Sequence, residues 1–260
     1  MLIHTITKSI TSSMTSSIII TDGEKPFSSC LTFNGVDEQS KLLIPDNTAL
    51  NISSALTVSA WAKNNNAIIN TFSKEAIVGK FDFSIDNYCE WKLAINDNEK
   101  VEIFLSQNGV STSSYWESTN AVNINKWNHY AFVFNGGTSL NVYLNGVEIP
   151  GSFVTGSLPA SIFNGPTNLT IGSVREPNTE VWEGQICDVR IFNSNLSAAQ
   201  ISSIYLGASI IPNLAAWYPL NEGGGTTAND VSVNSNNGTL SAFNLVNAWA
   251  VNQNIFRYNG

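Results

Sequence analysis

The stretch KWNHYAFVFNGGTSLNVYLNGVEI, residues 126–149, decides the fold class. Successive side chains of a strand point to opposite faces, and residues 127–134 are largely apolar in both alternating sets. We therefore expect a strand that is covered on both sides. NGG at 135–137 and NG at 145–146 tolerate the positive φ of tight turns, so the whole stretch is predicted to form three strand pieces joined by two turns.

Short β-type runs separated by turn clusters extend over most of the chain, which is typical of a sandwich or a barrel. One short helix is predicted in NLSAAQISSIYLG, residues 195–207, where Ser197 can cap the N-terminus and Gly207 can end the helix. The predicted strands cover residues 29–35, 56–63, 90–96, 100–106, 127–134, 140–145, 168–174 and 184–192.

Composition limits the classes of partner. Only 12% of the residues are charged, the net charge is −8, and Lys and Arg form no cluster. Such a chain has no basic surface to neutralise phosphates, so nucleic acid and anionic membrane surfaces are not expected as partners. No run approaches the roughly 20 apolar residues that span a bilayer. The N-terminus lacks an uninterrupted apolar region, so no secretory signal is recognised.

Changes in composition along the sequence predict three parts. Residues 1–26 form a Ser/Thr-rich arm, residues 27–207 a folded domain, and residues 208–260 an Asn/Gly-rich extension. A segment of about 50 residues rarely folds alone without disulfides or a bound metal, so the extension is expected to pack on the sandwich or on a partner. The cysteines show no metal-binding or redox spacing, and buried thiols and a disulfide both stay open for them: Cys30, Cys89 and Cys187.

Several of these segments, taken in order, resemble the laminin G-like, concanavalin A-like jelly-roll family. The stretch 126–149 has its Trp-x-His and Tyr-x-Asn-Gly pattern. The other segments that carry the resemblance are LTFNGVDEQSKLLIP (31–45), LTVSAWAK (56–63), NLTIGS (168–173), WEGQICDVRIFNSNLSAAQI (182–201) and AAWYPLNEGGGTTANDVSVNSNNGTL (215–240). The resemblance implies an all-β fold, a two-sheet antiparallel jelly-roll sandwich with one short helix.

The same superfamily includes glycanases, and retaining enzymes of that kind need two carboxyl groups about 5 to 5.5 Å apart. The nearest candidates are Asp82 with Asp86, which runs into a turn, and Glu99 with Glu102, whose spacing puts them on opposite strand faces. His129 lies between aromatic residues and is predicted to be structural, and the other histidine is in the arm. We therefore expect no enzymatic activity.

Calcium is the metal that the resemblance suggests. Ca²⁺ prefers carboxylate, amide and carbonyl oxygens. Family members often place metal-binding acids at two segments, which implies Asp37, Glu38 and Asp188 as ligands here. Cys187 stands where an Asp is common in the family. A calcium site and a set of solvated turn and strand-edge acids therefore both stay open.

Aromatic residues in polar loops suggest ligand contacts, because sugar rings stack on Trp and Tyr while polar groups bond the hydroxyls. Tyr115 and Trp116 lie in a predicted loop at 113–118, and Trp182 lies in another at 175–184. Trp182 also matches a position where the family has a packing aromatic. Three tryptophans in predicted strands are assigned to the core: Trp61, Trp91 and Trp127.

These observations predict a non-catalytic, lectin-like recognition or adhesion module that binds a glycan or a surface protein, with calcium as an optional cofactor. The alternative is a structural decoration or fibre protein of a virus particle, a phage in particular. In that case the arm and the C-terminal extension would dock on other virion proteins, and the domain would adhere to the host surface. The expected location is extracellular or on the virion surface.

Overall fold

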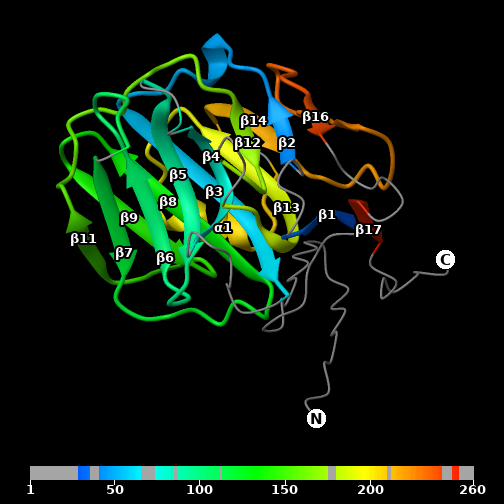
Figure 1. Cartoon of the computed structure of the whole chain (residues 1–260), viewed down its shortest axis with the longest axis horizontal. Coiled ribbons are helices and arrows are strands. Elements are labelled where there is room, and N and C mark those ends of the chain that lie inside the picture. The colour runs from blue at the N-terminus through cyan, green and yellow to red at the C-terminus, as the bar shows by residue number, and fades with distance from the viewer. Residues whose placement is uncertain are drawn as a thin grey trace, which may run out of the picture.

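In the computed structural model, two antiparallel β-sheets pack face to face (Figure 1). The structure describes residues 29–35, 41–65, 74–82, 84, 87–111, 113–174, 180–209, 212–241 and 248–251. Within these ranges the helical elements are a short 3₁₀ turn, η1 (Thr48–Leu50), and α1 (Ala198–Tyr205), and neither could cross a membrane. The predicted all-β jelly-roll sandwich with one short helix is confirmed.

One sheet has eight strands in the part of the chain that the structure describes. In spatial order these are β10 (Val147–Glu148), β9 (Ser139–Leu144), β8 (Asn128–Asn135), β3 (Ala55–Asn64), β13 (Glu183–Phe192), β1 (Ser29–Asn34) and β17 (Trp249–Val251), while β14 (Leu214–Tyr218) also pairs with β13. The three strand pieces predicted for residues 126–149 are β8, β9 and β10. Asn145 and Gly146 have φ values of 52° and 78°, as the predicted turn requires.

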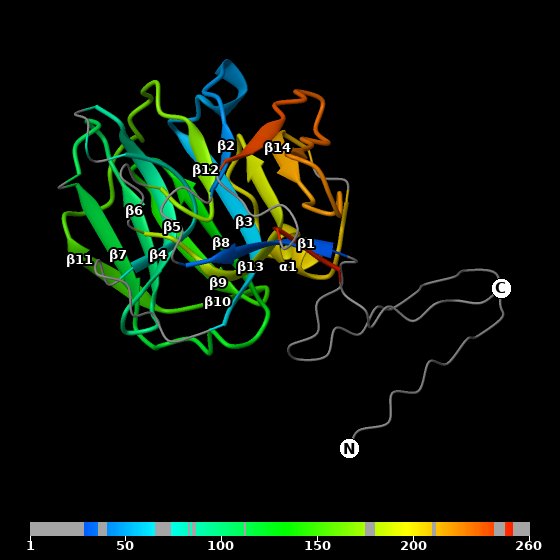
Figure 2. The same ribbon diagram turned by 45° about the vertical axis from the view of Figure 1, so that its right-hand side comes forward.

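The second sheet, with nine strands among the described residues, lies across the first, as Figures 1 and 2 both show for β5 to β7 over β8 and β9. Its spatial order is β11 (Gly151–Thr155), β7 (Ser114–Ser118), β6 (Val101–Leu105), β5 (Cys89–Asn96), β4 (Lys74–Phe81), β12 (Leu169–Ile171), β2 (Lys41–Ile44), β16 (Gly238–Ser241) and β15 (Thr227–Ala228).

The main core fills the space between the sheets. Alternate residues of β5 and β6 point inward, and so do alternate residues of β8 on the facing sheet. Burial of one such large apolar side chain contributes about 1.5 to 3 kcal/mol, so this interior is the main stabilising element of the fold. Its central members are Trp91, Leu93, Ile95, Ile103, Leu105, Tyr130, Phe132 and Phe134.

Helix α1 covers the outer face of the eight-stranded sheet. Its Ile201 and Ile204 pack on Ala131 and Val133 of β8, so β8 is covered on both sides as predicted. A capping box fixes the start of the helix: Ser197 Oγ accepts the Gln200 N–H at 3.4 Å, and Gln200 Oε1 accepts the Ser197 N–H at 2.9 Å.

Residues of the 208–260 extension supply strands to both sheets. β14 pairs with β13, β17 pairs with β1, and β16 pairs with β2 of the other sheet. The arm predicted at residues 1–26 lies outside the described residues, so it stays a prediction. All three cysteines are buried thiols, and none forms a disulfide.

Of the nine-stranded sheet, β5, β6 and β12 match predicted strands, whereas the remaining strands lie outside the predicted ranges: β2, β4, β7, β11, β15 and β16. Residues 114–118 were expected in a polar loop, but they form β7, in which Ser114, Trp116 and Ser118 are buried. Small serines beside one tryptophan let a strand fit at the sheet margin even though its composition is polar. β4 gave no clear signal, because Lys and Gly interrupt its apolar residues.

His129 lies on β8 beneath α1 and is completely buried. Its ring lies 5.6 Å from the Trp61 ring and 5.9 Å from the Tyr205 ring, measured between centroids. Neither ring nitrogen has a hydrogen-bond partner among the described residues. The burial, with the Arg190 guanidinium as a second cause, lowers the pKa of His129 to about 3.

Protonation of His129 should therefore destabilise the fold. Because the pKa is lower in the folded than in the unfolded state, the stabilisation is complete above about pH 6.5 and is lost as the pH falls toward 3. In urea unfolding between pH 6.5 and 4, the free energy of unfolding of the wild type should fall more steeply than that of His129→Phe, by up to about 1.4 kcal/mol per pH unit. Parallel curves for the two proteins would contradict this.

Candidate functional site

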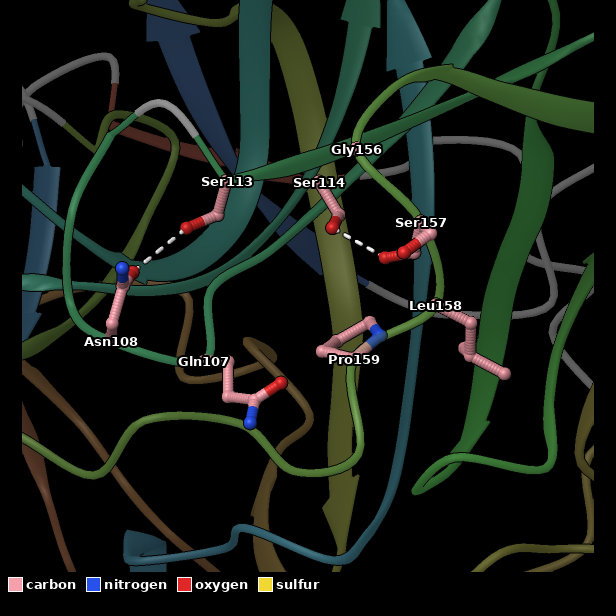
Figure 3. Close-up of a pocket in the computed structure, with 8 residues that line it drawn as sticks. All are labelled: Gln107, Asn108, Ser113, Ser114, Gly156, Ser157, Leu158 and Pro159. Carbon is pink, nitrogen blue, oxygen red and sulfur yellow. Dashed lines mark hydrogen bonds between the residues drawn. The ribbon is translucent and has the colours of Figure 1, made fainter.

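An open depression of about 480 Å³ lies where the β6–β7 turn meets the segment that follows β11 (Figure 3). The turn contributes one wall, and the start of β7 forms part of the floor. The residues that line it are Gln107, Asn108, Ser113, Ser114, Gly156, Ser157, Leu158 and Pro159.

The β6–β7 turn is held by its own side chains. Ser106 Oγ accepts the Gly109 N–H at 2.9 Å and lies 2.8 Å from Ser113 Oγ. Asn108 Oδ1 accepts from Ser113 Oγ at 3.1 Å and from the Val110 N–H at 3.4 Å. Serine and asparagine often bond nearby backbone in turns, and here these bonds fix the shape of one wall.

Hydrogen bonds between segments distant in sequence fix the second wall to the first. Ser114 Oγ donates to the carbonyl oxygen of Ser157 at 2.5 Å (Figure 3). Gly156 has a φ of +69°, and a Cβ placed there would lie 2.7 Å from Ser114 Oγ and 2.9 Å from the Ser113 carbonyl oxygen. Glycine at 156 is therefore needed for the walls to approach this closely.

The lining offers hydrogen-bond donors and a small apolar surface. Gln107 and Asn108 are exposed, and their side-chain oxygens already accept bonds from the Ala160 N–H and from Ser113. Their NH₂ groups donate to no other described residue and are directed by these bonds toward solvent or a ligand. Leu158 is half-buried beside them and adds an apolar edge with Pro159.

The aromatic residues predicted to bind a ligand lie elsewhere. Trp116 is 5% exposed and Trp182 is 0% exposed, and both belong to the main core. Since the core covers their ring faces, the ligand-contact prediction is corrected for these two. Tyr115 is half-buried on the outer face of the nine-stranded sheet, with its ring 4.9 Å from that of Phe104. None of the three lines the depression.

Asp188 does not fit a calcium ligand. Arg190 binds it through two bonds, Nε to Oδ1 and Nη2 to Oδ2, both at 2.9 Å, and Trp217 Nε1 donates to Oδ1 at 2.6 Å. The guanidinium thus supplies the positive charge that a cation would supply. Among the described residues no three His, Cys, Asp or Glu side chains gather as metal ligands. Asp37 and Glu38 lie outside those residues, so the calcium prediction for them stays a prediction.

A buried ionic cluster that no sequence motif indicates lies on the outer face of the nine-stranded sheet. Lys92 Nζ is 2.6 Å from Glu180 Oε2 and 3.4 Å from Glu102 Oε1, and Lys74 Nζ is 2.7 Å from Glu102 Oε2. Burial alone would lower the pKa of Lys92, but the two carboxylates raise it above its ordinary value. Lys92 alternates with inward-facing Trp91 and Leu93, which indicates that its side chain lies on the outer face. The carboxylates that bind Lys92 come from other strands and loops, so the sequence does not indicate the cluster.

Comparison with known proteins places the fold in a family. The laminin G model described as "Concanavalin A-like lectin/glucanases superfamily" matches residues 36–202, more than half of the chain. The chain belongs to this superfamily. A search among characterised protein sequences finds no significant match.

Solved structures resemble this chain at low sequence identity. A candidate carbohydrate-binding protein from Bacteroides ovatus is 16% identical, with a TM-score of 0.62, over 84% of this chain and 58% of that one. The chain therefore spans little more than half of that protein. Domain 4 of AbnA, an arabinanase from Geobacillus stearothermophilus solved with arabinotriose, is 19% identical over 67% of this chain and 75% of that one, with a TM-score of 0.46.

Substitution of Gly156 should disturb the depression. Gly156→Ala combines a positive φ with the close contacts to Ser113 and Ser114, so its free energy of unfolding should fall by about 1 to 2 kcal/mol. Gly224→Ala is the matched control, because no atom lies within 4 Å of a Cβ there, and it should change stability by less than about 0.5 kcal/mol. Equal urea midpoints for the two variants would argue against the tight approach of the walls.

The ionic cluster predicts a large difference between two lysines. Lys92→Met leaves Glu102 and Glu180 without their shared buried cation and should cost about 3 to 5 kcal/mol of unfolding free energy. Lys100 is partly exposed and 3.9 Å from Glu117, so Lys100→Met should cost less than about 1 kcal/mol. Chemical denaturation of both variants measures this, and a tolerated Lys92→Met would show that the cluster does not stabilise the fold.

Proposed function

We propose that this protein is a non-catalytic recognition module that binds a carbohydrate in the depression between the β6–β7 turn and residues 156–159. The observation that carries the proposal is the lining: side-chain amides and hydroxyls around a small apolar edge, on a wall shape fixed by internal hydrogen bonds. Sugars present hydroxyl groups and apolar C–H faces together, and a site of mixed character suits both.

The fold supports the proposal. The family includes lectins, and the structure from Bacteroides ovatus is a candidate carbohydrate-binding protein with the same architecture. Two of the buried acids, Glu102 and Glu180, are held in ion pairs by Lys74 and Lys92, which favours a structural role for these two. A glycan-binding module would act where glycans are exposed, on a cell or particle surface. The particle alternative depends on residues 1–26, which the structure does not describe, and stays a prediction.

Binding would be an equilibrium process with little rearrangement. Ser106 and Ser114 hold the two walls before any ligand arrives, so the free energy cost of ordering the loops is already met in the folded protein. Specificity would come from the NH₂ groups of Gln107 and Asn108, which are placed at the rim by bonds to their own oxygens.

Truncation of these amides should weaken binding, both by removing their NH₂ donors and by removing the oxygens that accept the Ser113 and Ala160 bonds of the walls. On an immobilised glycan panel, Gln107→Ala and Asn108→Ala should each reduce affinity about 10-fold for the glycans that the wild type binds, the effect of one or two lost hydrogen bonds. Asn120→Ala is the control, since Asn120 is exposed and lies outside the lining. Unchanged affinity in both rim variants, or no glycan bound by the wild type, would refute the proposal.

A further inference from the structure

The two segments that build the depression contain no charged residue. Between Glu102 and Glu117 the chain has no Asp, Glu, Lys, Arg or His, and the same holds between Glu148 and Arg175. The eight lining residues all come from these two segments. At the 12% of charged residues found in the whole chain, these segments of 14 and 26 residues would carry several charges by chance. They carry none, so the lining residues have no charged neighbour within either segment.

From this lining we infer that the site selects neutral saccharides and rejects saccharides that carry a carboxylate, such as uronic and sialic acids. The inference rests on the proposed function and adds the chemical class of its ligand. Proteins usually recognise a carboxylate through Arg or Lys, whose charge offsets the cost of removing the anion from water. A carboxylate placed against Leu158 and Pro159 would lose water without gaining a cation.

The charge of the whole chain acts in the same direction. A net charge of −8 repels an anionic ligand over distances of about 10 Å at ordinary ionic strength. Arg190 cannot supply a cation to the depression, because it is 2% exposed and bound to Asp188. Lys92 is likewise buried between two carboxylates on the outer face of the nine-stranded sheet.

The hydrogen-bonding groups of the rim suit a neutral sugar. The NH₂ groups of Gln107 and Asn108 donate, and hydroxyl and ring oxygens accept. Ser157 Oγ can donate or accept, which matches a hydroxyl in either role. Because no lining residue titrates between pH 5 and 9, affinity for a neutral sugar should also be insensitive to pH and to salt in that range.

Pairs of polysaccharides that differ only in oxidation at C6 test the inference. β-1,4-Mannan with β-1,4-polymannuronate and β-1,4-glucan with β-1,4-polyglucuronate are compared by affinity electrophoresis and calorimetry with the full chain, at 50 and 500 mM NaCl. We expect at least one neutral polymer to bind, its oxidised partner to bind at least about 10-fold more weakly, and the neutral affinity to change less than about 2-fold with salt.

A charge introduced at the rim provides the reciprocal test. Gln107→Lys should improve binding of the oxidised polymer relative to its neutral partner by about 10-fold at 50 mM NaCl, and 500 mM NaCl should remove the gain. Ala199→Lys adds the same charge on exposed helix α1 and should leave the ratio unchanged.

The outcomes separate the inference from the function on which it rests. If an oxidised polymer binds the wild type as tightly as its neutral partner, and Gln107→Ala weakens that binding, the depression is a carbohydrate site and only the neutral preference is wrong. If no polymer of either series binds, the proposed function is wrong and the inference falls with it.

Discussion

The alternation of side chains along the strands of two facing sheets is the constraint on which the rest of this structure depends. In β5, Trp91 and Leu93 enter the core while Lys92 between them points to the outer face. A shift of one residue would bury Lys92 in the apolar interior and expose the tryptophan, so the register is fixed. The same register fixes where each strand ends. The depression lies where β6 ends and β7 begins.

A rigid sandwich permits loops that are polar and yet ordered. The β6–β7 turn satisfies its polar groups internally through Ser106 and Asn108, and Ser114 joins it to the segment at 157. A loop with unsatisfied groups would need a ligand or water to hold its shape. The described residues of the turn bond one another, and under the proposed function the amide donors left at the rim would select the ligand.

Local chemistry made part of the structure predictable. The turn at Asn145 and Gly146 and the helix after Ser197 both depend on residues close in sequence, and both were predicted. The family resemblance implied the two-sheet jelly-roll sandwich around them. β7 was not predicted, because two inward serines give it the composition of a loop, and the prediction for Trp116 failed for the same reason.

The candidate site was harder to predict because its parts are distant in sequence. Ser114 and Ser157 are 43 positions apart, and no pattern in either segment indicates that they meet. Asp188 shows the same limit, since Trp217, which bonds it from 29 positions away, belongs to a segment assigned to the C-terminal extension. The missing charge around the depression was visible in the sequence, but its meaning depends on knowing that the two segments form one surface.

The most direct test of this account is to map the bound ligand by NMR. The amides of ¹⁵N-labelled protein are assigned and titrated with a neutral oligosaccharide that binds. The account predicts that the shift changes concentrate at residues 107–114 and 156–159, with the side-chain NH₂ signals of Gln107 and Asn108 among the largest. Changes centred instead on the outer face of the nine-stranded sheet, around Lys92 and Tyr115, would contradict it.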